Sequence, residues 1–188
     1  KKKKIAFVAD GMKTLVGNLA GLMDRQMALL VDTKFNHGLA SNLSGADPDR
    51  ASINHGLKAV QIGASAWTAE ALKQTMPASV FSRSTECHNQ DKVSMGTITA
   101  RDCLRVLQLT EQVVAANLLA VGQAIALREK SGELTKEQLG PKVSAFVDSL
   151  KEDIPFIAED QPLKGTLRLL VSRIQNRHWA LYDEEIPS

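Results

Sequence analysis

Residues 97–130 constrain the fold more than any other stretch, because apolar side chains recur there at helical spacings over a great length. They cover more than one face of the expected helix, and such a helix is buried in a bundle or at a subunit interface. Gly132 follows and suits a left-handed helix cap. The apolar positions are Ile98, Leu104, Val106, Leu107, Leu109, Val113, Val114, Leu118, Leu119, Val121, Ile125 and Leu127. The stretch predicts one long central helix over 97–130.

Two stretches before it also predict helices. Residues 5–31 carry an apolar stripe at alternating spacings of three and four, which is typical of the seam of a packed helix. Ser52 is placed to cap a second helix that runs to Met76 and is ended by Pro77. The stripe of the first helix consists of Ile5, Val8, Met12, Leu15, Leu19 and Leu22.

Residues 141–188 predict C-terminal helices, a short one that starts at Pro141 and a last one over 163–181. The whole chain shows no strand-length alternation and no internal repeat. Apolar residues make up 44 % of the sequence and aromatic residues 4 %, a mixture that suits helix-on-helix packing. The predicted fold class is all-α, with long helices in a bundle and 1–188 forming a single helical portion.

Charge and hydropathy exclude several classes of partner. The net charge is +2, and without the four lysines of residues 1–4 it is slightly negative, so we expect no nucleic-acid surface. Those lysines predict a disordered end or the boundary of an excised fragment. The longest uncharged run, 112–127, is shorter than the ~20 residues of a membrane span. We therefore expect no membrane partner and a cytoplasmic location, with Cys87 and Cys103 reduced.

The polar segment 82–96, SRSTECHNQDKVSMG, lies between two of the helical patterns. Glu86 and Asn89 are three residues apart, and Gln90 follows, so a turn can point their acceptors and donors to one side. Lys58 shares a helical stripe with small or apolar neighbours, and its ammonium either reaches water or enters a cavity. An ammonium near Glu86 would keep that carboxylate ionised. The alternative is a polar cluster that only satisfies a buried loop.

Other chemistry is poorly supported. Cys87 and His88 are neighbours, and adjacent residues rarely bind one ion; no second Cys/His pair has a ligand spacing, so we expect no metal site. Cys87 as a nucleophile with His88 or His55 as base has no orienting signature in the sequence. The glycines of the first helix form no phosphate-binding loop.

The segment 77–96 resembles the loop of the aromatic amino acid ammonia-lyases and 2,3-aminomutases, in which PASV leads into an NQD-V-SMG pattern. Three further stretches are similar to family elements in the same order. They are Phe35-Asn36-His37-Gly38-Leu39 (F-x-x-GLP, with Ala40 for proline), Asn54-His55-Gly56-Leu57-Lys58 with Gln61 (GLK-x-x-Q), and Glu159-Asp160-Gln161-Pro162-Leu163 (DRPL, with Gln161 for arginine).

This resemblance implies a long-helix bundle of the histidine/phenylalanine ammonia-lyase type and a homotetramer with sites built from three subunits. It implies the electrophile 4-methylideneimidazole-5-one (MIO), formed from an Ala-Ser-Gly triplet, which this chain does not contain. The chain thus resembles the C-terminal portion of such an enzyme. We expect it to need the N-terminal portion as a partner and to be inactive alone.

The resemblance also indicates a substrate and site residues. Histidine-specific members tend to have Gln-Glu-Asp-His where this chain has 89–92, and phenylalanine-type members pair a lysine and a glutamate at the positions of Lys58 and Glu86. It therefore implies L-phenylalanine as substrate, with cinnamate or β-phenylalanine as product, Glu86 and Gln90 as catalytic residues, and Lys58 and Asn89 as substrate-binding residues. The alternatives are a tyrosine-specific enzyme, a non-catalytic scaffold of the same fold, and an unrelated helical adaptor.

Overall fold

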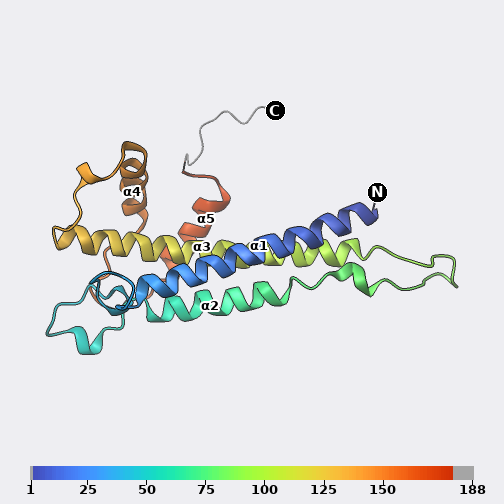
Figure 1. Ribbon diagram of the computed structural model, residues 1–188, viewed down its shortest axis with the longest axis horizontal. Coiled ribbons are helices and arrows are strands. Elements are labelled where there is room, and N and C mark those ends of the chain that lie inside the picture. Colours follow the sequence, from blue (N-terminus) through green and yellow to red (C-terminus); the bar gives the residue numbers. More distant parts are fainter. Residues whose placement is uncertain (1, 180–188) are drawn as a thin grey trace. The chain divides into compact units, whose positions relative to one another are not determined.

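The computed structural model describes residues 2–179, which form helices and connecting loops (Figure 1). No strand is present in this range, and Thr85 and Gln90 form only an isolated antiparallel bridge. The predicted all-α class is confirmed. The helices are α1 (Lys2–Val31), α2 (Lys58–Lys73), α3 (Gly96–Lys130), α4 (Pro141–Asp153) and α5 (Lys164–Gln175), with short 3-10 turns at Ser41–Leu43, Ala51–Ile53, Ala78–Phe81 and Lys136–Gln138.

The bounds of α3 follow the sequence pattern closely, whereas the first and last helices depart from theirs. Helix α3 begins one residue before the predicted stretch 97–130, and Gly132 has the left-handed backbone expected of its cap, with φ of 76°. Residues 2–4, predicted as a disordered end or the boundary of an excised fragment, belong to α1, while Lys1 lies outside the described residues. Helix α5 ends at Gln175, earlier than the predicted 163–181, and residues 180–188 lie outside the described range.

The predicted start of the second helix is wrong. Ser52 lies in a 3-10 turn, and α2 starts only at Lys58. Between them, Gly56 has φ of 55°, and a Cβ there would lie 2.5 Å from the carbonyl oxygen of Asn42. This left-handed, crowded position requires glycine, so the chain cannot continue as a helix from Ser52 to Lys58.

The chain divides into two compact units. The first unit consists of residues up to 25 and residues 62–113, and the second consists of residues 26–61 and residues from 114 onward. Each unit is built from segments far apart in the sequence, because the long helices run from one unit into the next. The units are considered one at a time below.

The first unit has a core of small and branched side chains from α1, α2 and α3. Its buried members are Val16, Ala20, Ala71, Val106, Leu109 and Val113, with Met23, Trp67 and Leu107 packed against them. Gly17 allows a close approach, since a Cβ there would lie 2.8 Å from Cγ2 of Thr75. Small residues on α1 therefore face the other helices of the unit.

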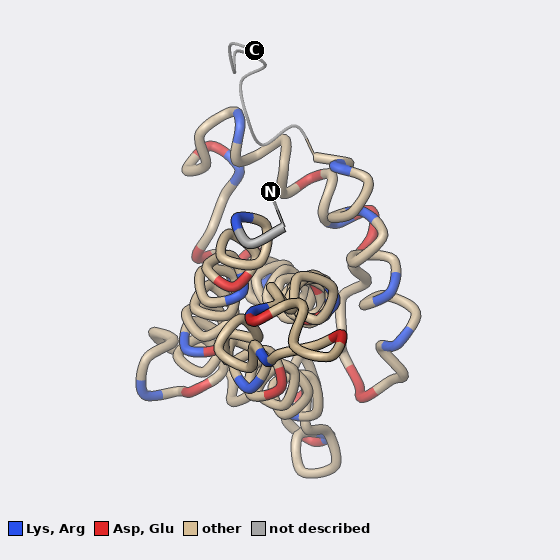
Figure 2. Tube along the Cα trace, turned by 90° about the vertical axis from the view of Figure 1, so that its right-hand side faces the viewer, with Lys and Arg blue, Asp and Glu red and all other residues tan. Residues whose placement is uncertain are grey.

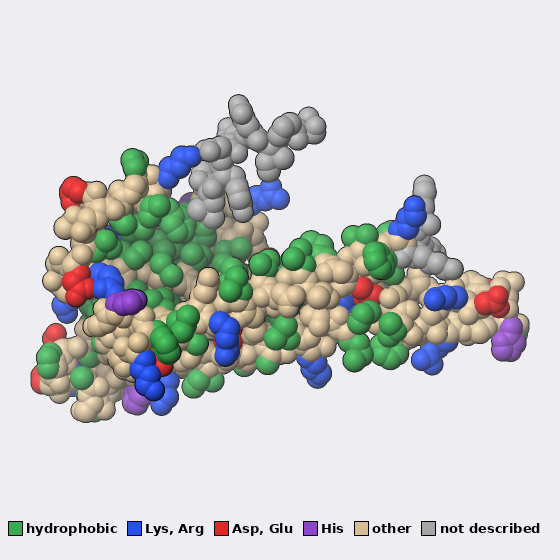
Figure 3. Space-filling model, viewed as in Figure 1, with side chains coloured by type: hydrophobic (Ala, Val, Ile, Leu, Met, Phe, Trp, Pro, Cys, Tyr) green, Lys and Arg blue, Asp and Glu red, His purple; other side chains and the backbone are tan. Residues whose placement is uncertain are grey.

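The apolar stripe of α1 does not pack against the described chain. Its six residues, from Ile5 to Leu22, are each between 45 % and 64 % exposed, and apolar side chains are visible on the surface along α1 (Figure 3). The prediction that this stripe forms the packed seam is wrong within this chain. Helix α1 is apolar on two faces, and the face that packs here carries Ala6, Val16 and Ala20.

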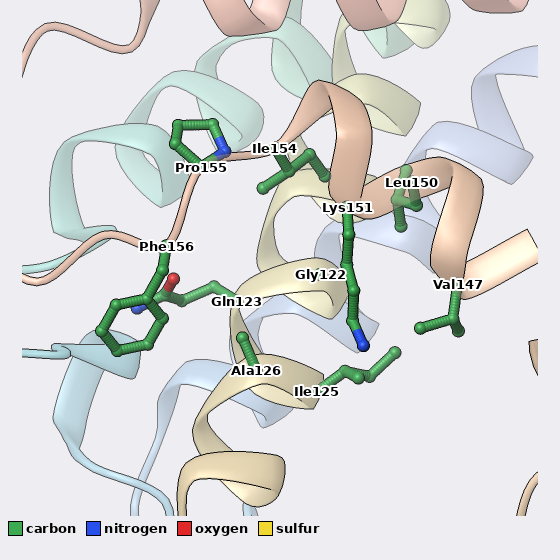
Figure 4. Close-up of a pocket in the computed structure, with 10 residues that line it drawn as sticks. All are labelled: Gly122, Gln123, Ile125, Ala126, Val147, Leu150, Lys151, Ile154, Pro155 and Phe156. Atoms are coloured by element: carbon green, nitrogen blue, oxygen red, sulfur yellow. The ribbon is translucent and has the colours of Figure 1, made fainter. Parts of the chain in front are cut away.

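In the second unit, Gln123 of α3 links two distant segments of the chain, and its side chain is completely buried. Its Nε2 donates to the carbonyl oxygens of Leu43 and Ile157, at 3.1 and 2.9 Å, and its Oε1 accepts from the amide of Ile157 at 3.0 Å. Beside it, Val147 and Leu150 of α4 lie near Gly122 of α3 (Figure 4). The cavity between them is about 20 Å³, enough for about one water molecule.

Charged residues of both signs are spread over the described chain (Figure 2), although α5 carries only basic ones, Lys164, Arg168 and Arg173. Two helical stretches, Lys4–Val31 and Gly96–Lys130, are long and apolar enough by composition to cross a membrane. Buried residues make up 33 % of the tested window in the first and 56 % in the second. Core helices have this composition too, and α3 contributes Val106, Leu109 and Val113 to the core of the first unit. The absence of a membrane partner stays a prediction.

Candidate functional site

The polar segment forms a narrow loop beyond the end of α2, closed by backbone hydrogen bonds. The Thr85 amide donates to the carbonyl oxygen of Gln90 at 3.0 Å, and the Gln90 amide donates to that of Thr85 at 3.2 Å. Between them, three consecutive residues, Glu86, Cys87 and His88, have φ of 56°, 51° and 68°. Non-glycine residues rarely adopt this left-handed region, and such strain is concentrated at functional sites.

This loop brings Glu86 and Asn89 together, as their spacing predicts. Nδ2 of Asn89 donates to Oε2 of Glu86 at 3.3 Å, and the Asn89 amide donates to the carbonyl oxygen of Glu86 at 2.9 Å. All residues from 83 to 92, including Gln90, are exposed. The cluster therefore does not satisfy a buried loop within this chain; its carboxylate and carboxamides are presented outward.

Lys58 is the first residue of α2 and is exposed. It belongs to the second unit, whereas Glu86 belongs to the first. Of the stripe predicted with Lys58, Ile62 is 61 % exposed, and the Ser65 hydroxyl donates to Oδ1 of Asp24 at 2.6 Å. The pairing of the Lys58 ammonium with the Glu86 carboxylate stays a prediction.

The segment just before Lys58 is held in place by the carboxylate of Asp160, which lies about one hundred residues later in the chain. Asp160 accepts hydrogen bonds from the amides of His55 and Gly56 at 2.9 Å, and its own amide donates to Oδ1 of Asn54 at 2.6 Å. Next to it, Arg50 forms a two-point ion pair with Glu159, at 2.8 and 2.9 Å. Hydrogen bonds from the Arg50 guanidinium lower the pKa of Glu159. Residues 159–160 thus position the start of α2.

Replacing Asp160 with alanine is expected to lower the free energy of unfolding by about 1–2 kcal/mol, because two backbone amides lose a charged acceptor that is itself partly exposed. Hydrogen exchange should also become faster at the amides of His55 and Gly56. Urea unfolding and exchange measured by mass spectrometry check both results. The control is Asp49→Ala, an exposed aspartate in the same region. An equal effect of the two variants would show that Asp160 does not hold this segment.

The loop itself is attached to a buried charge pair that the sequence analysis missed. Lys13 of α1 is completely buried, and its Nζ lies 2.9 Å from Oδ1 of Asp10. Asp10 also accepts hydrogen bonds from the amides of Ala78 and Ser79, at 3.1 and 3.2 Å. Burial raises the pKa of the Asp10 carboxyl, but the hydrogen bonds from Lys13, Ser79 and Ala78 outweigh this and lower it. The i, i+3 spacing of two opposite charges inside an apolar helix was the signal that could have revealed the pair.

The second unit also contains a cavity of about 430 Å³ with mostly apolar walls. Its Arg128 donates to the carbonyl oxygens of Asn36 and His37 and pairs with Glu133. The carboxamide atoms of Asn36 have no hydrogen-bond partner among the described residues, but they are themselves covered and do not face the cavity openly. Gln26 and His37 complete its polar lining, and the remaining walls are apolar, so this cavity offers a ligand mainly apolar contacts.

The cysteines and acidic residues of the described range form no metal cluster. Cys87 is exposed and Cys103 is buried, and neither forms a disulfide. Residues 2–179 contain no group of three or more His, Cys, Asp or Glu side chains that could hold an ion.

Comparison with known proteins places this geometry in a family. Residues 1–152, most of the chain, match the family model described as aromatic amino acid lyase. The chain belongs to this family. It is 35 % identical over 170 residues to a tyrosine ammonia-lyase of Cereibacter sphaeroides, covering 90 % of this chain and 31 % of that protein. It is 34 % identical over 178 residues to a histidine ammonia-lyase of Desulfotalea psychrophila, covering 90 % and 33 %.

Solved structures of family members have the same fold as this aromatic amino acid lyase chain. The tyrosine aminomutase of Streptomyces globisporus matches with a TM-score of 0.85 and 28 % identity, over 94 % of this chain and 32 % of that one. The phenylalanine aminomutase of Pantoea agglomerans matches with a TM-score of 0.81 and 24 % identity, over 90 % and 31 %. The chain spans about one third of the length of these relatives. The predicted bundle of the histidine/phenylalanine ammonia-lyase type is confirmed.

Proposed function

We propose that this chain is the C-terminal part of an MIO-dependent enzyme that removes ammonia from L-phenylalanine, giving cinnamate, or moves it to give β-phenylalanine. Membership of the aromatic amino acid lyase family supports the reaction class. The observation that carries the site is the outward presentation of Glu86 and Asn89 on a strained loop. We further propose that the enzyme is a cytoplasmic homotetramer.

In this proposal the residues of this chain bind and orient the amino acid. The Glu86 carboxylate accepts hydrogen bonds from the substrate amine, and Lys58 binds the polar end of the substrate. The carboxamides of Asn89 and Gln90 donate to and accept from the polar end of the substrate. Holding the amine in a fixed orientation lowers the barrier because the reacting groups need not find each other.

The exposed carboxylate and carboxamides suit a prosthetic group that is contributed by another segment or subunit, since no Ala-Ser-Gly triplet occurs in this sequence. When present, that group supplies an electrophile for the substrate amine. Glu86 and Gln90 would then lie beside it and hold the amine toward it.

A second candidate is a tyrosine-specific enzyme, favoured by the 35 % identity to a protein named tyrosine ammonia-lyase. The lysine and glutamate at positions 58 and 86 support phenylalanine instead. A non-catalytic scaffold of the same fold is the remaining alternative. Absence of an Ala-Ser-Gly triplet from the sequence of the complete protein would support this scaffold and exclude the two enzymes.

The test is incubation of the complete enzyme, including the segment with the triplet, with L-phenylalanine, L-tyrosine and L-histidine separately, followed by chromatography of the products. Cinnamate alone identifies a lyase, and β-phenylalanine identifies an aminomutase. Faster conversion of tyrosine or histidine would overturn the proposed substrate. No product from any of the three would leave only the scaffold.

Glu86→Gln in the complete enzyme is expected to lower kcat/KM for L-phenylalanine about tenfold to hundredfold, which corresponds to about 1.4–2.7 kcal/mol of transition-state stabilisation. The change keeps the shape of the side chain but removes its charge, so the oligomer and the melting temperature should not change. Steady-state kinetics measure the effect. The control is Glu152→Gln, the same replacement at an exposed position of α4. Equal kinetics for the two variants would place Glu86 outside the site.

A further inference from the structure

A cluster of three charges lies beside the two chain segments that lead into and out of the loop that carries Glu86. Nζ of Lys13 lies 2.9 Å from Asp10 and 3.5 Å from Oδ2 of Asp102, and it donates to the carbonyl oxygen of Met76 at 2.8 Å. The side chain of Lys13 is fully buried, that of Asp10 is 7 % exposed, and that of Asp102 is 28 % exposed. All four residues belong to the first unit.

The cluster reaches the chain on both sides of the loop. Before the loop, Lys13 binds the carbonyl oxygen of Met76, and Asp10 binds the amides of Ala78 and Ser79. After the loop, Lys13 pairs with Asp102, which lies in the second turn of α3. One ammonium group and its partner carboxylate on α1 therefore contact both stems of the loop, residues 76–79 and the start of α3.

Stability alone does not explain such a cluster. A buried ion pair can often be replaced by well-packed apolar residues with no loss of stability, because removing charges from water is costly. Apolar residues would suit this face of α1, which elsewhere carries Ala6, Val16 and Ala20. Charges in their place give directional bonds to particular backbone groups. An apolar contact would not fix the direction of the chain at 76–79 in this way.

We propose that Lys13 and Asp10 are positioning residues, which fix both stems of loop 82–95 and so hold Glu86, Asn89 and Gln90 in the orientation needed by the substrate. This inference rests on the proposed function for the role of the loop. The residues do not touch the substrate. They act through the backbone at Met76, Ala78 and Ser79 and through Asp102.

The matched control is Asp153, which is also a buried aspartate in a charge pair. Its carboxylate binds Arg173 at two points, both at 2.9 Å, and its side chain is 5 % exposed. Asp153 lies in the second unit, away in the sequence from either stem of the loop. Asp10→Asn and Asp153→Asn thus make the same change to a buried pair, but only the first affects the stems.

Kinetics of the complete enzyme with L-phenylalanine form the first measurement, at a temperature at which both variants are folded. Asp10→Asn is expected to lower kcat at least tenfold, whereas Asp153→Asn should leave kcat within about twofold of the unaltered enzyme. Equal losses of kcat in the two variants would overturn the proposal. If Asp10→Asn does not fold, Asp102→Ala, which releases only the α3 stem from a partly exposed position, must lower kcat by itself. An unchanged kcat in that variant would overturn the proposal as well.

Hydrogen exchange of the complete enzyme is the second measurement and does not depend on activity. Asp10→Asn, or Asp102→Ala in its place, should increase exchange in the segment from Ala78 to Gln90, and Asp153→Asn should not. Unchanged exchange there would show that the cluster does not hold the loop. Inactivity of the unaltered complete enzyme would refute the proposed function. The exchange result would still decide whether Lys13 and Asp10 hold the two stems of the loop.

Discussion

Replacing Gln123 with leucine is expected to lower the free energy of unfolding by about 3–5 kcal/mol. The side chain is completely buried and satisfies three backbone groups, the carbonyl oxygens of Leu43 and Ile157 and the amide of Ile157. Leucine has a similar volume but no polar atoms, so these groups would stay buried without partners, at about 1–3 kcal/mol each. The gain from burying an apolar side chain offsets part of this loss.

Urea unfolding of the 188-residue chain, followed by circular dichroism, gives the change in the transition midpoint. The control is Gln112→Leu on the same helix, where Nε2 donates to the Gln108 carbonyl oxygen at 3.3 Å. Its effect should stay within about 0.5 kcal/mol. If Gln123→Leu lowered the free energy of unfolding as little as Gln112→Leu, the backbone groups near Gln123 would have found other partners.

The Gln123→Leu replacement should also affect the segment before Lys58 in the candidate site. Ile157 is followed by Glu159 and Asp160, which hold the segment before Lys58. A loosened Ile157 should therefore increase hydrogen exchange at His55 and Gly56 in the Gln123→Leu variant. Residues 157–160 thus connect the core of the second unit to the start of α2.

The long central helix could be predicted from the sequence because twelve apolar positions repeat the same signal, and only one residue at its start differs. Helix α1 shows the limit of such patterns. Periodicity identified the apolar stripe from Ile5 to Leu22, but this helix is apolar on two faces, and the stripe is the exposed one. A periodic pattern finds an apolar face without saying which neighbour covers it.

Local spacing predicted that Glu86 and Asn89 point to one side of a turn, and their side chains meet there because residues three apart in a turn need no help from the rest of the chain. The start of α2 could not be predicted in the same way. Its approach depends on Asp160, more than one hundred residues later. The pairing of Lys13 with Met76 and Asp102 is equally remote in sequence. The sequence resemblance included residues 159–163 but assigned no role to Asp160.

Lys13→Met is expected to lower the free energy of unfolding at neutral pH by about 3–5 kcal/mol, because it leaves the Asp10 carboxylate buried without its cation. Methionine fills a similar volume, so lost packing contributes little. The double variant Asp10→Asn/Lys13→Met should be more stable than Lys13→Met alone, since it removes the unpaired charge. Urea unfolding of the four proteins gives the coupling energy of the pair. A coupling energy near zero would mean that the two charges do not stabilise each other.

The stability lost in Lys13→Met should become smaller as the pH falls. The pKa of Asp10 is lowered in the folded protein from its ordinary value of 3.8, so its contribution is fully present above that value and is lost as the pH falls through the lowered pKa. In Lys13→Met the pKa of the same buried carboxyl should rise, because burial is no longer opposed by the ammonium. Asp10 then becomes protonated at a higher pH in the variant than in the unaltered chain. The stability difference between the two proteins should therefore shrink on acidification from neutral pH, and a difference that stays constant down to pH ~3 would contradict an ionised Asp10 bound to Lys13.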